Sequence, residues 1–137
     1  MPLKVLLAKG LIKATPEAIF IALNRSPAHL IRSKAYLLSA IESLYWAAVD
    51  AAHAALMAAK QIPPSPEQIG FMLNEVFVKK KLLDKKYVSI YNKIYSLAHA
   101  IVHGEVKEIK GSKVDEFYNL IDSFVREMAK LINRIVK

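Results

Sequence analysis

The sequence contains neither glycine nor proline between Pro27 and Pro63, so nothing in that interval interrupts a helix. Alanine, the strongest helix former, is concentrated in the second half of the interval, at Ala47, Ala48, Ala51, Ala52, Ala54, Ala55, Ala58 and Ala59. Small side chains of this kind let a neighbouring helix approach closely. The interval therefore predicts one long, closely packed helix over residues 27–60, starting at the signal Ser26-Pro27.

Three further stretches have apolar residues at the three- and four-residue spacing of an amphipathic helix. They cover residues 66–79, 86–103 and 113–136. The segment Ser65-Pro66-Glu67-Gln68 predicts a capping box at the start of the first stretch, and Ser112 can cap the last. No stretch alternates as a strand does, and no internal repeat is visible. We therefore predict an all-α fold, an up-and-down four-helix bundle.

The N-terminal residues predict extra short helices before the bundle. Thr15-Pro16-Glu17 has the pattern of a helix start, since threonine caps and proline at the first position loses no hydrogen bond. An apolar stripe precedes it at Leu3, Leu6, Leu7 and Leu11. We predict a single helical domain over residues 1–137, with short helices in residues 1–26 and the bundle in residues 27–137.

Composition narrows the classes of function. The chain has no cysteine, which excludes disulfides and thiolate metal sites. Its net charge of +8 favours an anionic partner such as RNA or a nucleotide, although a lysine-rich surface alone has the same signature. The N-terminal apolar run is too short for a signal peptide. The longest apolar stretch, residues 44–59, contains Asp50 and His53, which indicates a buried helix and not a membrane span. We expect a cytoplasmic protein.

The stretch over residues 86–103 carries the most conspicuous polar chemistry, because His99 and His103 lie one helical turn apart. An imidazole can accept a proton from a ribose hydroxyl or deliver one to a leaving oxygen. That chemistry also needs a cation to stabilise the developing charge. Two other roles stay open: a polar seam at an interface or helix end, and a metal site completed by Asp50 and His53.

Three segments resemble the HEPN superfamily, small helical bundles associated with nucleotides and RNA, over about residues 33–135. Residues 43–56, SLYWAAVDAAHAAL, resemble the family helix A-Y-Y-A-A-F-H-A-A-R-A-L-L. Residues 77–83, FVKKKLL, resemble the family turn f-v-k-x-g-l-l. Residues 98–103, AHAIVH, resemble the signature R-N/H-x-x-x-H. His103 stands at the signature histidine and His99 at the polar position, whereas Ala98 replaces the signature arginine.

The resemblance implies a homodimeric binding or partner module. Such modules often accompany a minimal nucleotidyltransferase in toxin–antitoxin-like or nucleotide-handling pairs. The alternative that it implies is a metal-independent endoribonuclease using His103, with His99 taking part of the missing arginine's role. A cation such as Arg126 would then have to reach the site. A purely structural oligomer is the third interpretation, so enzymatic activity stays open.

The candidate residues for binding nucleotide or RNA are the basic turn after residue 78 and two polar residues of the long helix. These are Lys79, Lys80, Lys81, Lys85, Lys86, Asp50 and His53. We expect no cofactor and no resident metal ion.

Overall fold

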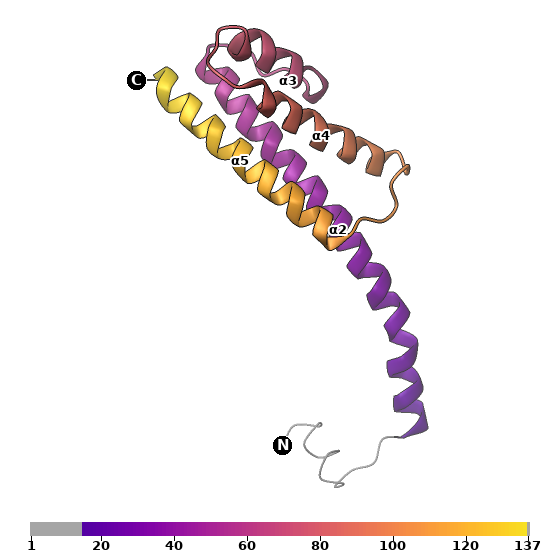
Figure 1. Ribbon diagram of the computed structural model, residues 1–137. Coiled ribbons are helices and arrows are strands. Elements are labelled where there is room, and N and C mark those ends of the chain that lie inside the picture. The colour runs from indigo at the N-terminus through magenta and orange to yellow at the C-terminus, as the bar shows by residue number, and fades with distance from the viewer. Residues whose placement is uncertain (1–14, 137) are drawn as a thin grey trace, which may run out of the picture. The chain divides into compact units, whose positions relative to one another are not determined.

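The computed structural model describes residues 15–136, and all regular structure in this range is helical. The predicted all-α class is therefore confirmed for these residues. The chain divides into two compact units, residues 1–34 and residues 35–137. Helix α2 (Pro16–Ala58) contributes to both. Helices α3 (Pro66–Leu73), α4 (Lys85–Val102) and α5 (Gly111–Val136) belong to the second unit (Figure 1).

Helix α2 begins where the sequence predicts a helix start. The Ala18 amide donates a hydrogen bond to Thr15 Oγ1 at 3.1 Å, and Pro16 takes the first helical position. The threonine thus satisfies one of the amides that have no partner within the first turn. The earlier helix predicted around residues 3–11 lies outside the described residues.

The predicted second start at Ser26-Pro27 is wrong, because α2 continues through it without a break. The Ser26 hydroxyl donates to the Ala22 carbonyl at 3.5 Å and does not cap a new helix. Pro27 cannot donate a backbone hydrogen bond, but the turns on either side remain helical. The short helix expected from residue 16 and the long helix expected from residue 27 are one element.

Helix α2 ends at a residue in the left-handed conformation, Lys60, with φ 63°. The Gln61 amide donates to the Leu56 carbonyl at 2.9 Å and closes the last turn. Residues 59–65 then return along α2, so that His53 Nε2 lies 2.8 Å from the Pro64 carbonyl oxygen. This extended return separates α2 from α3 and departs from simple up-and-down connectivity. Helices α4 and α5 do run in opposite directions (Figure 1).

Helix α3 passes directly into a π-helix, η1 (Asn74–Val78), so the predicted helix over residues 66–79 has two hydrogen-bond patterns. The capping box predicted at its start is not formed. Ser65 makes no cap hydrogen bond, and its hydroxyl lies 3.5 Å from Glu67 Oε1. Helix α4 is capped by Asp84, whose carboxylate accepts a hydrogen bond from the Lys86 amide at 2.9 Å.

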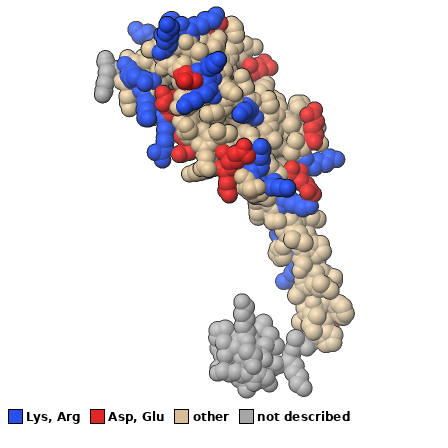
Figure 2. Space-filling model, viewed as in Figure 1, with Lys and Arg blue, Asp and Glu red and all other residues tan. Residues whose placement is uncertain are grey.

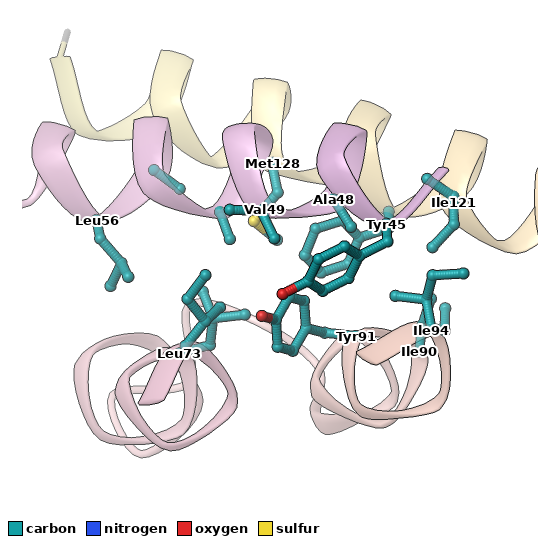
Figure 3. Packing of buried hydrophobic residues seen from close by; sticks show 14 of the residues in the cluster. Tyr45, Ala48, Val49, Leu56, Leu73, Ile90, Tyr91, Ile94, Ile121 and Met128 are labelled. Carbon is teal, nitrogen blue, oxygen red and sulfur yellow. The ribbon is translucent and has the colours of Figure 1, made fainter. Parts of the chain in front are cut away.

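The core of the second unit is apolar and is built around the alanines of α2. Ala48, Ala52 and Ala55 are fully buried on the face that other helices approach. Figure 3 shows α2 and α5 contributing Val49 and Met128 on one side of the core. Helices α3 and α4 contribute Leu73, Tyr91 and Ile94 on the other. Each fully buried leucine or isoleucine stabilises the fold by about 1.5–3 kcal/mol.

Within residues 15–136, every buried side-chain nitrogen or oxygen has a hydrogen-bond partner. No helix in that range has the length and apolar character required to cross a membrane.

We predict that Ala52→Leu lowers the free energy of unfolding by about 1–3 kcal/mol, because a larger side chain must enter a filled core. The control is Ala47→Leu, since Ala47 is exposed on the same helix. It should change stability by less than about 0.5 kcal/mol. Urea unfolding followed by circular dichroism measures both variants. Equal effects would contradict close packing at Ala52.

Candidate functional site

A row of rings lies where α4 passes α2. Tyr95 and His99 stack on α4, with ring centroids 4.1 Å apart and an interplanar angle of 30°. Tyr45 of α2 approaches His99 edge-on at 6.1 Å. His103, at the end of α4, continues the row with its centroid 6.0 Å from that of His99. The row follows from the four-residue spacing on α4, which places successive rings above one another. We call Tyr45, Tyr95, His99 and His103 the ring row.

Two cavities flank His99, and both have Tyr45 and His99 in their walls. The larger measures about 220 Å³ and is closed on its far side by Ser65 and Glu67 of the return segment and α3. The smaller measures about 90 Å³, lies between α2 and α4, and includes Trp46 in its wall. A small planar ligand in either cavity would contact the His99 ring.

The cations that RNA cleavage requires do not line these cavities. Ala98, which aligns with an arginine only in the HEPN resemblance drawn from the sequence, is 6% exposed and lines the smaller cavity. Arg126 instead pairs with Asp122 on its own helix, with Nε 3.1 Å from Oδ2. In a single copy, the described residues around His99 thus offer an acid or base, but no cation for a developing phosphorane.

Apart from these two cavities, an open groove of about 1,090 Å³ runs along α4 toward α5. We call it the lysine groove, after Lys85, Lys86 and Lys93 of α4 and Lys113 of α5, which line it. Two acidic side chains also line it, but both are engaged. Glu116 pairs with Lys113 at 3.4 Å, and Asp84 caps α4. Figure 2 shows Lys and Arg outnumbering Asp and Glu on the visible face.

The lysine groove and the ring row meet on α4. Asn92 and Ser96 line the groove, and helical spacing places them on the same side of α4 as His99 and His103. A polar stripe therefore leads from the lysines at the start of α4 to the imidazoles at its end.

The structure brings only part of the predicted basic turn into this groove. Lys85 and Lys86 line it, whereas Lys79 pairs with Glu75 at 2.6 Å on η1. Lys80 and Lys81 are exposed in the turn and do not line the groove. Sequence reasoning missed Lys93 and Lys113. Lys93 was detectable, since it lies seven residues, or two turns, beyond Lys86 on the same helix face. Lys113 was not, because its place depends on how α5 packs.

Asp50 and His53 line neither the cavities nor the lysine groove. Asp50 is exposed, and His53 is hydrogen-bonded to the Pro64 carbonyl. Nowhere in residues 15–136 do three histidine or acidic side chains converge to hold a metal ion. The alternative metal site built from these two residues with His99 and His103 is therefore not formed.

A buried tyrosine, Tyr91, packs beside the ring row, with its ring centroid 6.2 Å from that of Tyr95. Tyr91 is 1% exposed and donates a hydrogen bond to the Pro66 carbonyl at 2.6 Å. Figure 3 shows its hydroxyl pointing toward that of Tyr45. Burial raises the pKa of Tyr91 well above 10.0, and the nearby Tyr45 and Tyr95 hydroxyls raise it further. Burial likewise raises the pKa of Tyr45, with a smaller contribution from Tyr95. The Tyr91 and Tyr45 phenols thus stay uncharged in mildly alkaline solution.

The Tyr91 phenol makes stability depend on alkaline pH. Because its pKa is raised in the folded state, its stabilising contribution is complete below about pH 10 and is lost as the pH rises further. We expect the free energy of unfolding to fall above about pH 10, and to fall less steeply in Tyr91→Phe. At neutral pH that variant should lose about 1 kcal/mol with its hydrogen bond. Urea unfolding from pH 7 upward tests this. Tyr118→Phe, at an exposed position of α5, should keep the wild-type profile.

Comparison of the chain with protein-family models, with curated proteins and with solved structures finds no match. The residues of the ring row and the lysine groove are therefore the starting point for its function.

Proposed function

We propose that this chain is a HEPN-like helical module that binds a nucleotide or RNA. It acts as a homodimer beside a minimal nucleotidyltransferase, in a nucleotide-handling or toxin–antitoxin-like pair. One observation carries the proposal: four lysines from two helices line one open groove that leads along α4 to the ring row. A polyanion that carries aromatic bases is the ligand class that uses both features.

The lysine groove supplies the electrostatic part of such binding. Ammonium groups attract phosphates without regard to sequence, and counterion release makes that attraction strongly dependent on salt. The groove is open, so a phosphate can reach the lysines while remaining partly hydrated. Asn92 and Ser96, farther along α4, add amide and hydroxyl groups that can hydrogen-bond to sugars or bases.

The ring row supplies a surface for bases. Bases stack on aromatic and imidazole rings in proteins that bind single-stranded RNA. Tyr95 and His99 are only half-buried, and the cavity of about 220 Å³ gives access to both rings. Because Tyr91 and Tyr45 stay neutral, they do not repel a phosphate in the way that a phenolate would.

A backbone feature of the basic turn supports the HEPN resemblance. Lys81 has φ 61°, the left-handed conformation that favours glycine. Lys81 also stands where the family turn f-v-k-x-g-l-l has its glycine. The turn closes like a helix end, because the Leu82 amide donates to the Phe77 carbonyl at 2.9 Å. A left-handed residue at the position of the family glycine is what supports the proposed resemblance.

The nuclease alternative rests on the exposed His103 and its neighbour His99. In its favour, two imidazoles one turn apart can act as acid and base in one reaction. Against it, Ala98 and the cavity walls supply no cation. Cleavage would need a cation from a second copy or from the RNA's own counterions. Binding needs no such addition, so the binding module is the better-supported function.

We predict that Lys93→Glu weakens binding of a fluorescently labelled single-stranded RNA by about tenfold at moderate salt. It should also reduce the slope of log affinity against log salt by about one. Lys130→Glu is the matched control, because it makes the same charge change at an exposed position of α5 outside the groove. Fluorescence anisotropy measures both variants. Equal weakening by the two would show that net charge, and not the groove, attracts RNA.

The only tryptophan, Trp46, lines the small cavity beside His99 and reports on the ring row directly. We expect its emission to change when mononucleotide or RNA binds, and His99→Ala to reduce that change. The same samples test for catalysis. The binding module predicts intact RNA after incubation in EDTA. Cleavage in EDTA that disappears in His103→Ala would instead establish the nuclease.

A further inference from the structure

Residues 16–34 of α2 have an exposed apolar face. Its side chains recur at helical spacing and are between 55% and 69% exposed: Ile19, Phe20, Leu23, Leu30 and Ile31. We call these five residues the α2 stripe. Figure 2 shows the surface of this segment to be mostly free of charged side chains. Five large apolar residues on one face exceed the scattered exposure that is normal for a monomer surface.

The other side of the same segment is polar. Arg25 and Arg32 project from it by helical spacing, and His29 contacts the Arg32 guanidinium. Ile21 is the exception, an apolar residue on the polar side that is 51% exposed. The segment is thus amphipathic, with an apolar side suited to a partner and a basic side suited to water.

A helix of this kind needs a partner to persist in water. Helices of this length are marginal in isolation, and Pro27 removes one backbone hydrogen bond from the middle of the segment. Burial of the stripe against a partner would supply the stabilising free energy that the backbone hydrogen bonds alone do not provide. Each side chain exposes roughly 100 Å², so two copies pairing through the stripe would bury about 1,000 Å² in total. That area reaches the lower limit of a specific protein interface.

We infer that the α2 stripe is a pairing surface for a second copy of this chain, with the two helices antiparallel. Charge selects this direction. The segment begins with Glu17 and ends with Lys34, which helical spacing places on the side of the stripe, unlike Arg32. An antiparallel pair places the acidic start of one helix beside the basic end of the other, whereas a parallel pair places like charges together. Antiparallel helix dipoles favour the same arrangement.

The sizes of the side chains also suit an antiparallel pair. The stripe has two apolar groups, Ile19 to Leu23 and Leu30 to Ile31, separated by Ser26 and Pro27. In the antiparallel pair, each apolar group faces the opposite group of the other copy. Ser26 then lies near the two-fold axis, where its small side chain permits close approach.

This inference rests on the homodimer of the proposed function and names its contact surface. Its test measures oligomeric state without any nucleotide. Loss of RNA binding with an intact dimer would therefore reject RNA binding and leave the inference standing. An intact dimer that Leu23→Glu does not weaken would reject the inference and leave RNA binding standing.

The first experiment is sedimentation equilibrium of the full chain over a range of concentrations. We expect a dimer whose dissociation constant rises at least about a hundredfold in Leu23→Glu, because a carboxylate would enter the apolar contact. Ile21→Glu is the matched control, with the same kind of change on the polar side of the same helix, and should remain dimeric. A monomeric wild type would overturn the inference, as would a dimer that both variants weaken equally. The stripe would then belong to another segment of the chain or to a different protein.

A second experiment tests the direction of the pair with single-cysteine variants. The chain has no cysteine, so single cysteines can be introduced without background. In an antiparallel pair, Ser26→Cys should cross-link to its counterpart under mild oxidation, because the two copies of residue 26 meet near the axis. Ile19→Cys should not cross-link, because its counterpart lies at the far end of the pair. Cross-linking of Ile19→Cys would establish a parallel pair, and cross-linking of neither would overturn the inference.

Discussion

The position of the candidate site depends on two side chains that hold the return segment between α2 and α3. That segment, residues 59–65, contains Pro63 and Pro64 and is followed by Pro66 at the start of α3. None of these prolines has an amide hydrogen with which to form a ladder with a neighbour. Their carbonyls still require donors when they are covered. The His53 imidazole lies 2.8 Å from the Pro64 carbonyl oxygen, and the Tyr91 hydroxyl lies 2.6 Å from that of Pro66. These contacts fix the start of α3 beside the ring row and so create the larger cavity.

The same contacts explain why residue type alone was a poor guide to the role of His53. A histidine on an alanine-rich helix was a reasonable candidate for a nucleotide contact, but the return segment engages its Nε2 atom. Periodicity predicted the three later helices well, because burial of an apolar face decides whether a helix forms. The short helix-start signals predicted the structure less well than periodicity did. At Pro27 the helix continues unbroken through the start signal, and at Ser65 the hydroxyl lies near the Glu67 carboxylate and makes no cap hydrogen bond.

In the candidate site too, residues on a single helix could be predicted from the sequence, whereas residues brought together by packing could not. The stripe of Asn92, Ser96, His99 and His103 was predictable, since one helix contains all of it. The lysine groove was predictable only in part, because Lys113 joins it through the packing of α5 against α4. The cavities beside His99 were not predictable, because their walls come from α2, the return segment and α4 together. Ala98 gives the smaller cavity an apolar wall, which favours binding of a planar group over stabilisation of charge.

A chain with a net charge of +8 must satisfy two opposing demands if it is to bind polyanions and also self-associate. Like charges on two copies repel each other, and the repulsion is strongest at low salt. Self-association through an apolar stripe whose basic residues lie on the opposite side reduces that repulsion. The lysine groove belongs to residues 35–137 and the α2 stripe to residues 16–34. Salt therefore acts on them in opposite directions, weakening the attraction of phosphates to the lysines while screening the repulsion between copies. The chemistry of the two surfaces would therefore let the proposed dimer form without using the charges that attract the proposed ligand.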